Sequence, residues 1–159
     1  MHLDHYFRSE DDPHHIHLPE FDHHDWESIN ALDIDRFIAD VHMHRQKCDL
    51  LLVEGFLIFN IRFPSERGIF DLLYYFDLPY EECLRRRLQR HYVPPDPPGY
   101  FQGHVWDAFV KSKKEALNRF QPCNLAIVNT EDESFESIEQ RIVKDIERTL
   151  LSSESRKTD

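Results

Sequence analysis

Glycine is scarce in this sequence, and a glycine-rich loop is absent. Of the 159 residues only four are glycines, and none of them is followed by Lys. The sequence therefore contains no GxxxxGK(S/T) segment, the loop whose backbone amides hold phosphate groups. The three cysteines are widely spaced and form no CxxC pair, which argues against a disulfide framework or a thiolate zinc site and favours a reducing compartment.

Long apolar runs and an excess of positive charge are also lacking. No apolar stretch reaches the length that a bilayer requires and no signal-peptide pattern is present, so we expect a cytoplasmic protein without a membrane span. The net charge of −11 argues against binding to DNA, RNA or an acidic membrane surface. Residues 85–91 are the exception, because this basic island suits one small anion better than a long polyanion.

Apolar spacing predicts strands that alternate with helices. We expect helices at 28–44, 80–91, 105–119 and 135–150, and strands at 49–54, 71–76 and 125–128. The strand at 49–54 is expected to be buried on both faces. Residues 1–27, which hold seven of the eleven histidines, and the proline-rich residues 92–106 are predicted to be loops. This order indicates one α/β domain over 1–150 with a mainly parallel sheet, followed by a disordered polar tail at 151–159.

A carboxylate ends the predicted strand at 49–54. Glu54 follows four apolar residues and precedes Gly55. Ligands of parallel sheets bind beyond the carboxyl ends of the strands, so the partner of Glu54 is expected to be a ligand or a metal. Mg²⁺ beside phosphate groups is the usual occupant of such a position. The alternative is a glutamate that caps a helix or forms an ion pair.

The basic island falls on the predicted helix at 80–91. Arg86 and Arg90 are four residues apart and Arg87 is three from Arg90, which would direct all three toward one cleft. Guanidinium groups suit phosphates, and a basic helix before a long loop is typical of a lid in phosphoryl-transfer enzymes. Charge alone favours a different arrangement, a solvated helix face on which the arginines pair with Glu81 and Glu82.

Weaker signals lie near the N-terminus. Asp4 precedes aromatic residues and is a candidate general base or second metal carboxylate. Trp26 beside Glu27 is suited to stack a flat ring while the acid accepts sugar hydroxyls, although a surface anchor for a loop is the commoner role. The histidine-rich segments at 14–17 and 23–24 have no spacing typical of a designed metal site, so they favour only adventitious Zn²⁺ or Ni²⁺ binding.

Four segments taken together resemble the nicotinamide riboside kinase family, a branch of the uridine-kinase-like P-loop kinases. They are LDHYFR, WESINALDI, LLLVEGFLIFN and PYEECLRRRLQRHYVPPDPPGYFQGHVW. The resemblance runs from about residue 1 to about residue 150. It implies a parallel sheet flanked by helices, and transfer of the γ-phosphoryl group of ATP to the 5′-hydroxyl of nicotinamide riboside. The product would be nicotinamide mononucleotide, an intermediate of NAD salvage.

The resemblance also implies roles for individual residues. Asp4 is implied to be the base and, with Glu54, to face Mg²⁺, while Arg86 and Arg90 would lie near the phosphates of ATP. The residues implied to hold the nucleoside are Asp4, Phe7, Trp26, Glu27, Arg87 and Tyr92. Trp26 and Tyr92 would enclose the cationic nicotinamide ring, an arrangement that aromatic faces favour. Glu27 departs from the family, which has Asp at this place.

The family's P-loop is what this sequence lacks. In the family it lies upstream of the segment matched by Asp4, so we expect that the first strand, the P-loop and the first helix are missing and that activity is impaired. Two alternatives stay open. One is a non-catalytic remnant that binds a nucleoside or a protein, and the other is a kinase of the same fold that acts on uridine or cytidine. The sequence indicates no particular protein partner.

We predict that the purified 159-residue chain transfers negligible phosphate from ATP to nicotinamide riboside, because no residues are present to cradle the ATP phosphates. The measurement is a phosphorylation assay with Mg²⁺ on this chain and on one extended upstream to the nearest GxxxxGK(S/T). Activity of the short chain would contradict the prediction. Inactivity of both chains, if both fold, would contradict the kinase assignment.

Overall fold

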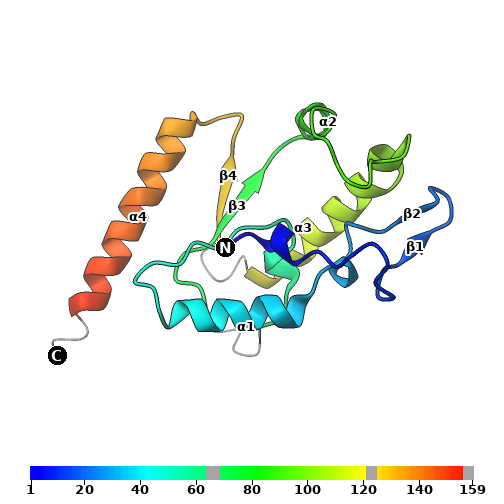
Figure 1. Cartoon of the computed structure of the whole chain (residues 1–159). Helices are drawn as coiled ribbons and strands as arrows, with labels where there is room; N and C mark the ends of the chain where they lie inside the picture. Colours follow the sequence, from blue (N-terminus) through cyan, green and yellow to red (C-terminus); the bar gives the residue numbers. More distant parts are fainter. Residues whose placement is uncertain (64–68, 121–124, 156–159) are drawn as a thin grey trace. The chain divides into compact units, whose positions relative to one another are not determined.

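The structure, a computed structural model, describes residues 1–63, 69–120 and 125–155, with side chains described to residue 152. Contacts divide the chain into two compact units, Met1–Pro64 with Tyr92–Arg119 and Ser65–His91 with Phe120–Asp159. Both units contain helices and strands, and the second contains a small parallel sheet, so the predicted α/β class is confirmed (Figure 1). The single domain expected over 1–150 stays a prediction, and each unit is described by itself.

The first unit combines a short antiparallel pair with helices and single turns. Its elements are η1 (Leu3–Tyr6), β1 (His17–Leu18), β2 (His23–His24), η2 (Ile29–Ala31), α1 (Ile34–Arg45), η3 (Ile58–Asn60), the π-helical turn η4 (Phe101–Val105) and most of α3 (Trp106–Phe120). The strands β1 and β2 have two residues each, so the expectation of a loop-rich segment at 1–27 is largely confirmed.

Helix α1 begins later than predicted because its capping residue is Asp33. The Asp33 side chain accepts a hydrogen bond from the backbone amide of Arg36 at 3.2 Å, which satisfies one of the free amides of the first turn. The preceding residues 29–31 form the separate turn η2. Phe37 and Val41, four residues apart on one face of α1, are buried in the core of the unit.

The predicted buried strand at 49–54 is wrong. Among the described residues this run pairs only with the chain's first residues, through Leu3 N to Glu54 O and Glu54 N to Met1 O, both 2.9 Å. Leu50 and Leu52 are 50% and 64% exposed, whereas a strand inside a parallel sheet would bury them. An apolar run becomes a buried central strand only where other segments pair with it on both edges. Among the described residues, the run at 49–54 has a paired segment on one edge only.

Gly55 is required by the contact between these two segments. A Cβ atom at position 55 would lie 2.3 Å from Leu3 Cβ, far inside van der Waals contact. Leu3 itself has no exposed surface, so its side chain has little room to move away. The close approach of the two backbones therefore explains why a glycine follows Glu54.

The second unit contains a parallel sheet with two helices. Strands β3 (Tyr74–Asp77) and β4 (Ala126–Asn129) pair in parallel, with Tyr74 opposite Ala126 and Asp77 opposite Asn129. The predicted strands at 71–76 and 125–128 are thus confirmed with shifted bounds. Helix α2 (Tyr80–Arg87) follows β3, and α4 (Phe135–Ser155) follows β4.

Two helix ends in the second unit differ from the prediction. Helix α2 ends at Arg87 instead of residue 91, because the next amides turn back to carbonyls three residues earlier, Gln89 N to Arg86 O and Arg90 N to Arg87 O. Helix α4 continues to Ser155, so residues 151–155 are helical rather than irregular. The rest of the predicted tail, 156–159, lies outside the described residues.

A hydrogen bond ties β3 to α4 within the second unit. The Tyr74 hydroxyl donates to Asp145 Oδ2 at 2.9 Å. Burial and this bond to a carboxylate raise the pKa of Tyr74 to about 12. Since the pKa is raised, the bond stabilises the folded state fully below pH 10, the ordinary pKa of tyrosine, and is lost as the pH rises through about 12.

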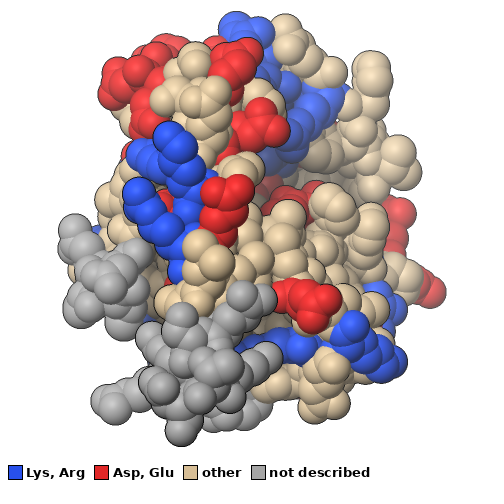
Figure 2. Space-filling model, turned by 90° about the vertical axis from the view of Figure 1, so that its left-hand side faces the viewer, with Lys and Arg blue, Asp and Glu red and all other residues tan. Residues whose placement is uncertain are grey.

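The surface mixes charges of both signs. On the face in Figure 2, small groups of Lys and Arg lie beside small groups of Asp and Glu. Among the helices within the described ranges, none combines the length and the apolar content that crossing a membrane requires.

We predict that Gly55→Ala destabilises the first unit by about 1–3 kcal/mol, the usual cost of overpacking. The measurement is equilibrium unfolding in denaturant. Leu3→Ala should not rescue the variant, because the atom closest to the new methyl group is Leu3 Cβ, which alanine retains. Unchanged stability of Gly55→Ala would mean that the two segments are not in contact.

Candidate functional site

The two predicted metal-facing carboxylates lie in the first unit. Asp4 belongs to η1, directly after the residues that pair in parallel with Glu54. The pairing places Asp4 and Glu54 at the same end of two adjacent segments. Glu54 accepts a hydrogen bond from His2 Nδ1, and both side chains are more than half exposed. Glu54 therefore has an internal partner, although the sequence indicated a ligand or a metal.

The donor set around Glu54 is small. Within the parts of the chain that the structure describes, no three His, Cys, Asp or Glu side chains are arranged to hold a metal ion. Mg²⁺ is commonly bound by one or two carboxylates together with substrate phosphates, so two carboxylates at one end of paired segments fit this ion and would not fit structural zinc.

Rings from distant parts of the sequence form a continuous row in the first unit. The Phe7 ring meets Trp26 edge-on at 5.7 Å between ring centroids and stacks on Phe56 at 6.0 Å. His15 lies 4.6 Å from Trp26 and stacks on His24 at 4.8 Å. We call Phe56, Phe7, Trp26, His15 and His24 the aromatic row. The structure thus brings together Phe7 and Trp26, two of the residues that the resemblance implies hold the nucleoside. The enclosure of the ring by Trp26 and Tyr92 stays a prediction.

The sequence prediction missed three members of the aromatic row. Phe56 lies in the turn that follows Glu54 and Gly55. No periodic pattern identifies a residue in such a turn. His15 and His24 belong to segments whose only distinctive sequence feature is their histidine content. No spacing rule connects them to Trp26.

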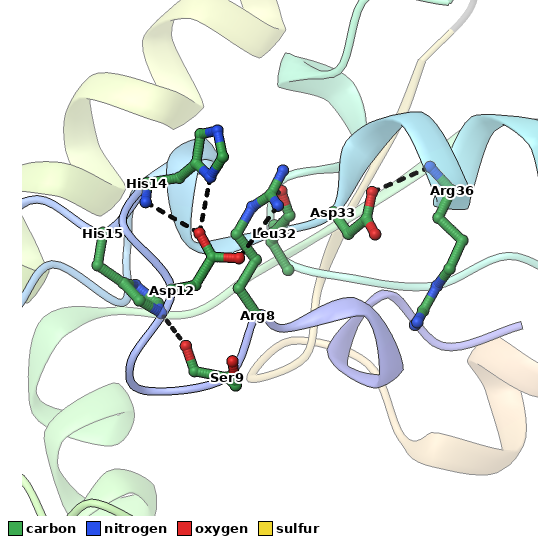
Figure 3. Close-up of polar contacts among 8 residues, drawn as sticks. All are labelled: Arg8, Ser9, Asp12, His14, His15, Leu32, Asp33 and Arg36. Carbon is green, nitrogen blue, oxygen red and sulfur yellow. Dashed lines mark hydrogen bonds and ion pairs between the residues drawn. The ribbon is translucent and has the colours of Figure 1, made fainter.

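The loop that carries His15 is held by a network of polar contacts (Figure 3). Arg8 Nη1 lies 3.4 Å from Asp12 Oδ2, while Asp12 Oδ1 accepts hydrogen bonds from the backbone amide and Nδ1 of His14 at 2.9 and 2.7 Å. These bonds from His14 lower the pKa of Asp12 to about 2. His15 Nε2 donates to Ser9 O at 2.9 Å, so the His15 ring is fixed within the row.

Glu27 and Tyr92 also lie in the first unit. The backbone amide of Glu27 donates to Asp25 Oδ1 at 3.1 Å, which closes a turn around Trp26. The side chains of Glu27 and Tyr92 are half-buried. Their predicted contacts, with ribose and with the second face of the ring, stay predictions.

The predicted phosphate-binding arginines lie in the second unit, and one carboxylate engages two arginines there. Arg85 donates to both oxygens of Glu82 at 2.6 and 2.7 Å, and Arg86 Nε donates to Glu82 Oε1 at 2.6 Å. These bonds lower the pKa of Glu82 to about 2. For Arg86 the alternative drawn from charge, pairing on a helix face, is confirmed. The shared helix face predicted for Arg86 and Arg90 is wrong, because Arg90 lies beyond the end of α2.

Comparison with known proteins agrees with the resemblance. No family model matches the chain. The chain is 38% identical to nicotinamide riboside kinase 1 of Mus musculus over 104 residues, 65% of this chain and 52% of that protein. It is 50% identical to nicotinamide riboside kinase 1 of Rattus norvegicus over 70 residues, 44% of this chain and 35% of that protein. It is 28% identical to nicotinamide riboside kinase 2 of Mus musculus over 172 residues, 96% of this chain and 84% of that protein.

The chain is therefore similar to proteins named nicotinamide riboside kinase, as four of its segments indicated. Against the kinase 1 proteins, the matched region spans about half of the relative or less. The similarity to the kinase 2 protein is weaker but extends over nearly the whole of this chain.

We predict that Glu82→Gln strengthens binding of pyrophosphate to the chain severalfold, because Arg85 and Arg86 lose an internal anion that competes for their guanidinium groups. The measurement is calorimetric titration with pyrophosphate. Glu81→Gln is the matched control, since it removes the same charge from the same helical turn but leaves these three hydrogen bonds in place. Equal gains in pyrophosphate affinity in both variants would mean that only the change in net charge matters, and would contradict the prediction.

The pH dependence of this pairing follows from the lowered pKa of Glu82. A lowered pKa means that the pairing contributes fully above about 4.5, the ordinary pKa of the group, and is lost as the pH falls through about 2. The difference in the free energy of unfolding between wild type and Glu82→Gln, measured by denaturation, should therefore be constant from pH 5 to pH 8.

Proposed function

We propose that this chain provides the nucleoside-binding part of an ATP-dependent kinase that converts nicotinamide riboside to nicotinamide mononucleotide, in the NAD salvage pathway. The observation that carries the proposal is its similarity to proteins named nicotinamide riboside kinase, which extends over 96% of the chain for kinase 2. The P-loop-kinase-like arrangement of the sheet is part of this proposal.

The aromatic row supports a flat cationic ligand. A pyridinium ring is attracted to the faces of aromatic side chains, most strongly to Trp. Trp26 is the central ring of the row, and Glu27 follows it with a carboxylate that can accept hydroxyl groups of the ribose. We propose Tyr92 as the second ring and Arg87 as a further contact to the nucleoside.

The proton and the phosphoryl group then have the following roles. Asp4 accepts the proton of the 5′-hydroxyl group of the nucleoside. The hydroxyl oxygen forms a bond to the γ-phosphorus of ATP, and the bond between that phosphorus and ADP breaks. Asp4 and Glu54 would hold Mg²⁺, with Glu54 exchanging its bond to His2 for the ion. When bound, Mg²⁺ neutralises charge on the phosphate oxygens. Arg86 and Arg90 add positive charge near ATP.

The proposed roles concern the residues that bind the nucleoside and the arginines of the lid. No GxxxxGK(S/T) segment occurs in this sequence, so no residue here is assigned to the cradle of the ATP phosphates. This observation favours one second candidate, a protein that binds the nucleoside without turning it over. The free thiols of Cys48 and Cys83 fit a reducing compartment, and we place the protein in the cytoplasm.

We expect nicotinamide riboside to bind the chain more tightly than uridine or cytidine, because only the first carries a cationic ring. The measurement is calorimetric titration with each nucleoside. Trp26→Leu should weaken binding of nicotinamide riboside about tenfold, whereas Trp26→Phe, which retains an aromatic face, should weaken it less.

Each outcome separates two candidates. Equal affinity for uridine and nicotinamide riboside would favour the pyrimidine-nucleoside alternative. Failure to bind any nucleoside would overturn the proposal. Binding without phosphorylation, in this chain and in one that contains a P-loop, would leave the non-catalytic candidate.

A further inference from the structure

The Trp26–Glu27 segment is tied to a distant helix by a partly buried polar pair. His104 Nε2 donates to Asp25 Oδ1 at 2.7 Å, and the two side chains are only 20% and 15% exposed. The same oxygen of Asp25 accepts the backbone amide of Glu27 at 3.1 Å. One carboxylate oxygen therefore fixes both the helix that carries His104 and the turn that contains Trp26.

Tyr100 makes a second connection from the same helical segment. Its side chain is fully buried. Its hydroxyl accepts from the backbone amide of Trp26 and donates to His24 O, both at 3.3 Å. The Tyr100 ring stacks on the His104 ring at 5.4 Å with an angle of 21°. The backbone on both sides of Asp25 is therefore held by two stacked side chains of one helix.

The helical segment approaches this loop closely for a local reason. Residues 101–105 form the π-helical turn η4, and such turns occur often at functional sites. A Cβ atom at Gly103 would lie 2.9 Å from Phe21 Cζ. Phe21 in turn meets the Tyr100 ring edge-on at 5.4 Å. The absence of a side chain at Gly103 thus admits Phe21 and lets the loop at 21–27 lie against the helix.

We propose that Asp25 and His104 are positioning residues for the nucleoside. They do not contact it. Their pair holds the Trp26 ring and the Glu27 carboxylate in the orientation that the aromatic base and the ribose require. This inference rests on the proposed function, since it gives Trp26 and Glu27 their ligand. It adds that Tyr100 and His104, which lie within residues 92–106, support the binding site through their polar contacts.

The pair depends on an acceptor oxygen more than on charge. An Asn at position 25 keeps an oxygen for both His104 and the Glu27 amide, while Ala removes it. Phe at position 104 keeps a ring to stack on Tyr100 but removes the donor. The variants Asp25→Ala and His104→Phe therefore delete the hydrogen bond with little change in packing, and Asp25→Asn is the conservative rescue.

The experiment measures the affinity for nicotinamide riboside by calorimetry, and hydrogen exchange of the backbone amides, in each variant. We expect Asp25→Ala and His104→Phe to weaken binding about tenfold. Asp25→Asn should recover most of the loss. The double variant should bind no more weakly than either single variant, because the two residues act through one bond. Exchange should accelerate at Trp26 and Glu27 and stay unchanged in helix α1.

Tyr74→Phe is the matched control. It keeps the ring and removes another hydrogen bond to a carboxylate, the 2.9 Å bond to Asp145, which lies within the second unit. This variant should bind nicotinamide riboside as the wild type does. A loss of equal size in Tyr74→Phe would overturn the inference, because the loss of any hydrogen bond to a carboxylate would then suffice.

The remaining outcomes separate the inference from the proposed function. Wild-type affinity in both Asp25→Ala and His104→Phe would overturn the positioning role and leave the proposed function standing. Weaker binding with faster exchange throughout the first unit would overturn it too, because the pair would then support only the fold. A wild-type chain that binds no nicotinamide riboside would overturn both.

Discussion

The pairing of residues 1–3 with residues 52–54 is the contact on which the first unit depends. It buries Leu3 completely and excludes any side chain at position 55. It also leads directly into η1, where the Tyr6 hydroxyl donates to Asp40 at 2.8 Å and the Arg36 guanidinium lies over the Tyr6 ring. Helix α1 is therefore attached to the same short segment that carries Asp4.

Three carboxylates of this acidic chain are engaged by its own cations and histidines. Glu54 binds His2, Glu82 binds two arginines, and Asp25 binds His104. The side chains of the pair at Glu54 are both more than half exposed, so this bond can be exchanged for one to a metal ion. The pair at Asp25 is more shielded from solvent and holds its neighbours in place.

Patterns of local spacing predicted much of the fold, and contacts between distant residues explain what they missed. The strands β3 and β4 and the helix α4 follow from apolar runs and helical periodicity, which are properties of neighbouring residues. The run at 49–54 failed because burial of a strand depends on which segments flank it. For the site, the resemblance implied that Phe7 and Trp26 contact the nucleoside, and this role stays a prediction. The pair between Asp25 and His104 joins residues 79 positions apart and has no local signature.

The π-helical turn constrains the length of the chain as well as its side chains. Such a turn contains one more residue than an α-helical turn, so it behaves as a single-residue insertion within the helix that continues into α3. Deleting one residue there would rotate Tyr100 by about 100° relative to α3. Tyr100 and Ala116 of α3, which are both buried, could then not both remain in their present packing environments. The chain should therefore tolerate insertions and deletions among residues 93–98 far better than the deletion of a single residue from η4.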